Sequence, residues 1–106
     1  MARNVLLAGR YPVLVEDAER QVTVPPSVRF FAATGLGEVR DAFAEAEIDH
    51  VIMGAGLDIE VRLEIVREVF RMSDTTTVHL KDFASGLDGF LPFAQAVLDG
   101  LTAHDS

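Results

Sequence analysis

The chain has 106 residues, of which 49% are hydrophobic and 25% are charged. Size and composition suit a single α/β or other globular domain with one hydrophobic core, residues 1–106. There are 17 acidic side chains against 9 basic ones, a formal net charge of −8. This balance argues against nucleic acid as a partner, because a phosphate backbone is bound by clustered cations. The chain has no cysteine, which excludes disulfides, thiolate metal sites and cysteine nucleophiles.

The apolar run near the start of the chain covers only residues 5–9. Such a run is too short for the core of a signal peptide and far too short to span a bilayer. We therefore expect a cytoplasmic protein that does not have a membrane as its partner.

Apolar runs alternate with amphipathic stretches along the whole chain. Short apolar or β-branched runs predict strands, and apolar residues spaced three and four apart predict helices. In chain order, the predicted elements are a strand at 4–9, a helix at 13–22, a strand at 27–34, a helix at 38–47, a strand at 49–54, a helix at 58–72, a strand at 75–81 and a helix at 88–101. Residues 104–106 are expected to fray.

Fourfold alternation of strand and helix predicts a parallel sheet with helices on both faces, because right-handed crossovers produce that arrangement. The simplest order for the four strands is 2-1-3-4. The sequence thus predicts an α/β domain of three layers.

The alternation, the chain length and the segment GLDGFLPF at 86–93 together resemble the response-regulator receiver and flavodoxin-like group. The resemblance implies a three-layer, flavodoxin-like fold. Receivers carry paired acids after the first strand and a phosphoacceptor aspartate at the end of the third. Here Arg10 and Tyr11 occupy the first of these places and Gly54 occupies the second. The resemblance is therefore to a degenerate receiver-like domain that lacks the phosphorylation residues.

Polar residues and glycines follow the predicted strands, and in open α/β sheets ligands bind outside the carboxyl ends of the strands. The candidate ligand-binding residues are Arg10, Gly54, Gly56, Asp58, His79, Lys81 and Asp82. Cations, backbone amides and the start of a helix at Asp58 together suit a small anion. The alternative is that these loops are polar and glycine-rich only because chain reversal and helix capping require it.

No motif predicts a cofactor, a metal site or a catalytic residue. The turn at 54–56 begins like a dinucleotide fingerprint, but Ile59 stands where that fingerprint has glycine or alanine. The three histidines are too far apart in sequence to resemble metal ligands. His79, Lys81 and Asp82 could do acid–base work. Since no serine or cysteine nucleophile accompanies them, a structural histidine is the preferred interpretation.

Two helices have apolar faces wider than contact with one sheet requires. In 58–72, Ile59, Leu63, Val66 and Phe70 are predicted to face the core, with a second stripe beside them. The predicted interface residues are Val61, Ile65, Val69, Met72, Leu91 and Leu98. Exposed apolar patches mark interfaces, so the pattern favours a homodimer, although adjacent helices could instead cover each other's flanks. The predicted function is a non-enzymatic interaction or regulatory module that self-associates. The alternative is an anion-binding protein or small enzyme using the strand ends.

Overall fold

The computed structural model describes residues 3–10, 28–54, 56–81 and 90–105, with side chains of the last helix described for 92–100. The strands are β1 (Arg3–Ala8), β2 (Val28–Ala33), β3 (His50–Met53) and β4 (Thr77–Leu80). The helices are α2 (Leu36–Glu45), α3 (Ile59–Met72) and α4 (Phe90–Asp105). The helix predicted at 13–22 lies outside the described residues.

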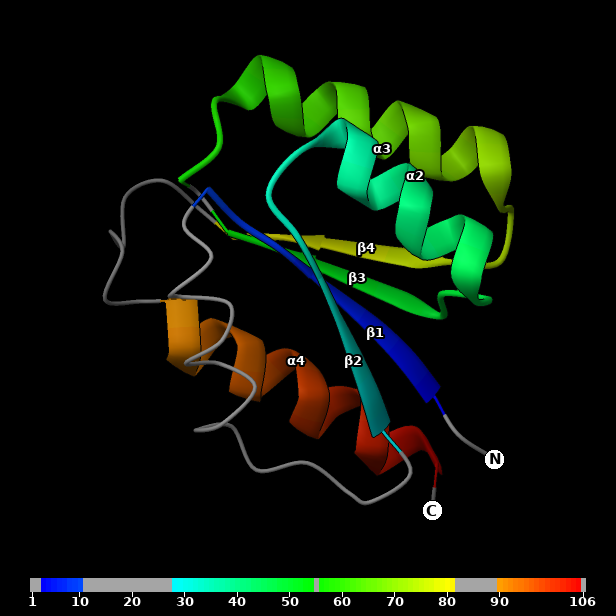
Figure 1. Ribbon diagram of the computed structural model, residues 1–106. Helices are drawn as coiled ribbons and strands as arrows, with labels where there is room; N and C mark the ends of the chain where they lie inside the picture. The colour runs from blue at the N-terminus through cyan, green and yellow to red at the C-terminus, as the bar shows by residue number, and fades with distance from the viewer. Residues whose placement is uncertain (1–2, 11–27, 55, 82–89, 106) are drawn as a thin grey trace.

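The four strands form one parallel sheet in the order β2-β1-β3-β4, as predicted (Figure 1). Ala8 of β1 pairs with Ala33 and with Met53, and Met53 pairs with Leu80. All four strands therefore end at one side of the sheet, which we call the carboxyl edge. The opposite side, where the strands begin, is the amino edge.

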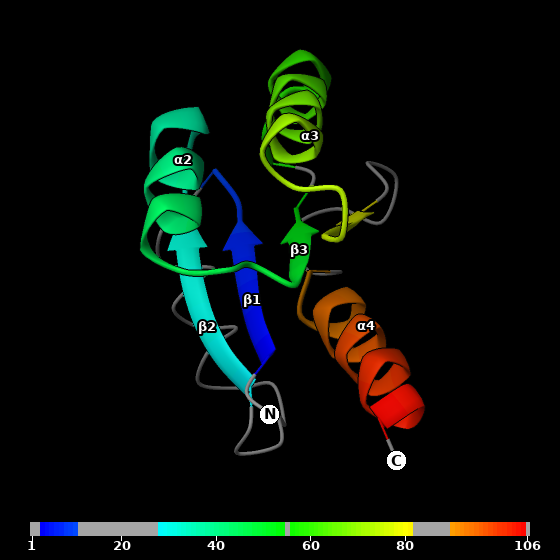
Figure 2. The ribbon, with the colours of Figure 1, turned by 90° about the vertical axis from the view of Figure 1, so that its right-hand side faces the viewer.

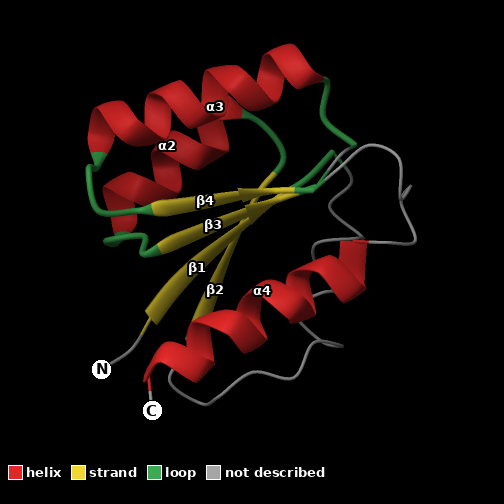
Figure 3. Ribbon diagram, turned by 180° about the vertical axis from the view of Figure 1, so that it is seen from behind, coloured by secondary structure: helices red, strands yellow, loops and turns green. Residues whose placement is uncertain are grey.

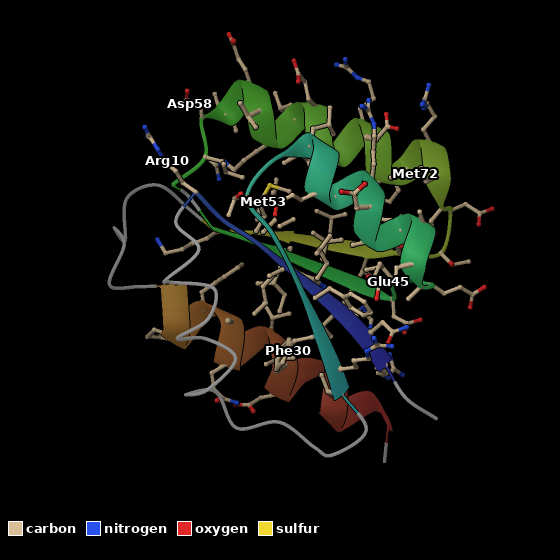
Figure 4. All side chains as sticks on the ribbon, viewed as in Figure 1. Arg10, Phe30, Glu45, Met53, Asp58 and Met72 are labelled. Carbon is tan, nitrogen blue, oxygen red and sulfur yellow. The ribbon has the colours of Figure 1, made fainter. Side chains whose placement is uncertain are left out.

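Helices cover both faces of the sheet, with α2 and α3 on one face and α4 on the other (Figure 2). Side chains alternate between these faces along each strand. Leu6 and Met53 pack in the cluster under α2 and α3, whereas Leu7 and Ile52 pack against α4. In Figure 4, Met53 points towards α2 and Phe30 towards α4. The result is the three-layer, flavodoxin-like α/β arrangement that the sequence predicts.

Two helix boundaries differ from the predicted ones. Helix α2 begins at Leu36, after Gly35 as N-cap, because Glu38 in its first turn accepts hydrogen bonds from the backbone and hydroxyl of Thr34. Helix α4 continues to Asp105 and includes Gly100. A glycine inside a helix costs only about 1 kcal/mol relative to alanine, so it does not by itself end the helix.

Helix α3 turns a different face to the core from the predicted one. Ile65 and Val69 are fully buried beneath it, whereas Ile59, Leu63 and Phe70 are 54%, 51% and 52% exposed. The assignment of the two stripes is therefore wrong. Of the predicted interface residues, Ile65 and Val69 are core residues, Val61 packs against the same core, Leu98 is buried against the other face of the sheet, and Met72 is exposed. The side chain of Leu91 lies outside the described residues.

The face that α3 turns to the core is related to its contact with the neighbouring helix α2. Glu68 lies on the α2 side of the helix, where it accepts a hydrogen bond from Arg40 at 3.2 Å and another from Arg71 at 3.0 Å. With Glu68 on the side of α2, the apolar arc extends from the buried residues Ile65 and Val69 to the flank of α3 that faces away from α2. No helix of the described residues covers that flank, so the far side of the arc lies in solvent (Figure 3). Periodicity sets the width of an apolar arc but not which neighbour covers it.

Candidate functional site

Three of the predicted ligand-binding residues follow adjacent strands at the carboxyl edge, namely Arg10 after β1, Gly54 after β3 and Lys81 after β4. Gly54 donates its backbone N–H to the carbonyl of Ala8, and Lys81 donates its own to the carbonyl of Met53, both at 2.9 Å. These bonds place Gly54 beside the end of β1 and Lys81 beside the end of β3. Arg10 and Asp58 are exposed at the same end of the molecule (Figure 4).

The remaining predicted residues have other positions. Gly56 lies in the turn before α3 and is half-buried. Asp82 falls outside the described residues. His79 is paired with Ile52, whose side chain packs against α4, so His79 lies within β4 on the α4 face and not in the turn that follows the strand.

His79 belongs to a row of polar side chains that crosses three strands. Arg3 Nη1 lies 2.7 Å from His50 Nε2, His50 Nδ1 lies 2.6 Å from Thr77 Oγ1, and Thr77 Oγ1 lies 3.0 Å from His79 Nε2. A guanidinium only donates, so His50 accepts at Nε2 and donates from Nδ1 to Thr77. The Thr77 hydroxyl then donates to His79. Burial lowers the pKa of His79, because desolvation disfavours the imidazolium.

Arg62 is a site residue that the sequence prediction does not include. It stands in the first turn of α3, is only 6% exposed, and donates from Nη1 to the carbonyl of Lys81 at 2.9 Å. Its Nε is buried and has no hydrogen-bond partner, and no carboxylate of the described residues forms an ion pair with it. The available signal is that Arg62 is the one charge inside the apolar arc of residues 58–72.

The N-terminus of α3 lies beside Arg62 and Lys81, and its N-cap side chain makes no capping hydrogen bond. Asp58 is the N-cap residue, but its carboxylate makes no capping hydrogen bond. At the start of α2, by contrast, Glu38 is bonded to Thr34. The hydroxyl and the backbone N–H of Thr34 together lower the pKa of Glu38. Neither helix has a side-chain hydrogen bond from its N-cap residue, and Glu38 of α2 bonds to Thr34 before the helix.

Buried charge is unevenly distributed over the described residues. Arg62 and Lys81, which are 6% and 2% exposed, come together at the carboxyl edge. The buried carboxylate of Glu68 lies on the flank of α3 that faces α2, where the hydrogen bond from Arg40 is the main reason that its pKa is lowered. Among the described residues, the two buried cationic side chains therefore lie at the carboxyl edge, in a chain whose net charge is −8.

A cavity of about 400 Å³ opens at the amino edge, between the ends of α2 and α3, and acidic and hydroxyl side chains form part of its wall. One of these acids, Asp49, accepts a hydrogen bond from the backbone of Asn4 at 2.8 Å. No group of three or more metal-ligating side chains is found in the part of the chain that the structure describes. The cavity therefore offers no evident chemistry.

Comparisons of the chain with protein-family models, with curated proteins and with solved structures find no match. Within the described ranges, every helix is too short or too polar to cross a membrane. The function must accordingly be inferred from the residues themselves.

Proposed function

We propose that the protein is a non-enzymatic interaction or regulatory module that acts as a homodimer through the exposed flank of α3. The observation that carries this proposal is a row of apolar side chains on that flank, Ile59, Leu63, Val66 and Phe70, which we call the outer row. Three of the four are more than half exposed, and Val66 is partly buried at the border of the core. Aligned apolar side chains left in water favour an interface.

The outer row is self-complementary when two α3 helices pack antiparallel. With the helices crossing near Ile65, Ile59 lies opposite Phe70 of the second copy, and Leu63 lies opposite Val66 of the second copy. A two-fold interface requires this reciprocity, because each residue must meet its partner twice.

The charges beside the outer row obey the same rule. Exposed Glu60 stands in the first half of α3 and exposed Arg67 stands in the second half, and both are neighbours of Leu63 on the helix surface, three residues before it and four residues after it. In the antiparallel arrangement, Glu60 lies near Arg67 of the second copy, and Arg67 lies near Glu60 of the second copy. A parallel arrangement would instead place like charges together, which costs free energy. The pattern of charge thus supports a second copy of the chain as the partner, in the antiparallel direction.

Strand β4 extends the same surface. It is an edge strand whose outer side has no strand partner among the described residues. Its residue Leu80 is 40% exposed and pairs with Met53, which packs under α2 and α3. Leu80 therefore faces the same side of the sheet as α3. A two-fold axis beside α3 would bring the two copies of this edge towards each other.

The experiment is to measure the mass in solution of the wild type and of Leu63→Glu by light scattering at micromolar concentration. The wild type should have about twice the 11.5 kDa mass of one chain, and Leu63→Glu should have the mass of one chain, because the new carboxylate would be buried unpaired in the apolar contact. Ala96→Glu, on an exposed position of α4, adds the same charge elsewhere and should stay dimeric. A monomeric wild type would contradict the proposal.

A further inference from the structure

We infer that the carboxyl edge also contains a binding site for a small oxyanion, a phosphate group or a carboxylate, built from Arg62 and the N-terminal turn of α3. This site is distinct from the dimer contact of the outer row. It lies where Arg62 reaches the carbonyl of Lys81, at the end of β4.

The first support for this site is that Arg62 is buried and its Nε has no hydrogen-bond partner. A buried charge is normally paired, because removing it from water without a counter-charge is costly. The partner of Arg62 Nη1 is a neutral carbonyl at 2.9 Å, and its Nε has no partner. Lys81, whose carbonyl receives that bond, is itself a cation with only 2% exposure. A buried guanidinium whose Nε has no partner is best explained by negative charge that joins it when a ligand binds.

The second support is the uncapped N-terminus of α3. The first N–H groups of an α-helix have no partner inside the helix, and they attract anions. Asp58 does not bond to them, and the helix runs for 14 residues, long enough for its dipole to contribute. Arg62 belongs to the same first turns, since its N–H bonds to the carbonyl of Asp58 at 2.9 Å. A planar guanidinium beside free amides matches the oxygen geometry of phosphate and carboxylate.

Nearby charges limit the strength of binding. The exposed carboxylates of Asp58 and Glu60 oppose an anion, while exposed Arg10 favours it. These three are in water, where charge interactions are weak and screened by salt. The buried guanidinium and the helix amides must therefore supply the affinity, and we expect a dissociation constant of about 1 mM for inorganic phosphate at low ionic strength.

The experiment is an NMR titration of the backbone amides with inorganic phosphate, against chloride at matched ionic strength. Shifts should concentrate in residues 56–62 and at Lys81. Arg62→Met should weaken binding about tenfold or more, because a charge-assisted hydrogen bond is lost. Arg62→Lys, which keeps the charge without the planar fork, should bind with intermediate affinity. Arg29→Met, which removes an exposed arginine from β2, should bind as the wild type does.

Shifts that are absent, or that chloride reproduces, would overturn the inference. Equal weakening by Arg62→Met and Arg29→Met would also overturn it, because only the total charge would then matter. If Arg62→Met does not fold, the position of the wild-type shifts and the Arg62→Lys result still decide the question. Loss of the dimer in Leu63→Glu should leave phosphate binding intact.

Discussion

The two edge strands of the sheet, β2 and β4, differ in the side chains on their outer sides. On the β2 side, the guanidinium of Arg29 lies over the ring of Phe31, 4.7 Å from its centroid, and reaches Glu45 of α2 at 3.8 Å. On the β4 side, the strand has no Asp, Glu, Lys or Arg, Leu80 is partly exposed, and the outer row of α3 stands in solvent. The helices differ in the same way, since Glu68 joins α3 to α2, whereas no helix of the described residues packs against the other flank of α3.

Within the described residues, charged contacts cover the β2 side and none cover the outer side of β4, a difference that supports the proposed contact on the β4 side. Charged side chains on an edge strand discourage pairing with another chain, and an arginine with its own contacts has less to gain from a partner. An uncharged edge next to exposed apolar side chains has no such protection. The β4 side is therefore where we place the second copy.

The largest expected effect is on the free energy of unfolding, and it should differ between the buried face of α3 and the outer row. Ile65→Ala should lower the free energy of unfolding by about 2–5 kcal/mol, because it leaves a cavity in the core. Ile59→Ala makes the same chemical change at a position that is 54% exposed and should cost about 0.5 kcal/mol or less in the monomer. Urea denaturation at a concentration where the protein is monomeric measures both. Equal costs would mean that the orientation of α3 is misassigned.

The β4 side should respond to pH near neutrality. Burial lowers the pKa of His79 below its usual 6.5, so the folded state favours the neutral imidazole. Its contribution to stability is complete above pH 6.5 and is lost as the pH falls through the lowered pKa of the folded state. The urea midpoint should therefore decrease on acidification below pH 6.5, and by less in His79→Gln. An identical pH dependence in this variant would show that His79 is not responsible.

The α2 side should respond only at lower pH. Hydrogen bonds from Thr34 lower the pKa of Glu38 below 4.5, and the bond from Arg40 has the same effect on Glu68. Both carboxylates stabilise the fold fully above pH 4.5, and this contribution is lost as the pH falls through their lowered pKa values. Glu38→Gln and Glu68→Gln should each flatten the acid-unfolding curve there while leaving the slope near pH 6 unchanged. A changed slope near pH 6 would contradict the separation of the two sides.

The smallest expected effect concerns the β2 edge of the sheet. Arg29→Ala removes a solvent-exposed ion pair and a cation–ring contact, each worth about 1 kcal/mol or less at such a site. The free energy of unfolding should change by no more than about 1 kcal/mol, and the mass in solution should stay that of the wild type. Altered self-association in this variant would place the contact on the β2 edge instead.

Much of the fold could be predicted because it depends on local pattern. Residues 4–9 and 49–54 are apolar runs of a kind that suits strands buried on both faces, and Asp58 after the second run marks where α3 begins. The strand order followed from alternation and crossover handedness. The rotation of α3 could not be predicted in this way. It depends on Glu68 meeting Arg40, residues 28 positions apart, and no periodicity within one helix contains that information.

The candidate sites show the same limit. Arg10, Gly54 and Lys81 could be assigned to the carboxyl edge, because each follows a strand. Arg62 could not, since an arginine in a helix normally extends into solvent, and its burial emerges only when α3 is placed against β4. Similarly, the sequence predicted an interface on the helix at 58–72. The interface residues that we propose differ from the predicted ones, because Ile65 and Val69 are buried in the core.

The central claim, an antiparallel contact between two α3 helices, is tested most directly by exchanging charges across it. In Glu60→Arg, two arginines per contact would face each other, and in Arg67→Glu two acids would do so, so each variant alone should be monomeric by sedimentation velocity. Mixed in equal amounts, the two variants should form a heterodimer, because Arg at 60 then meets Glu at 67 and the native pair is kept on the other side of the axis. Dimers of either variant alone, or no association of the mixture, would contradict the account.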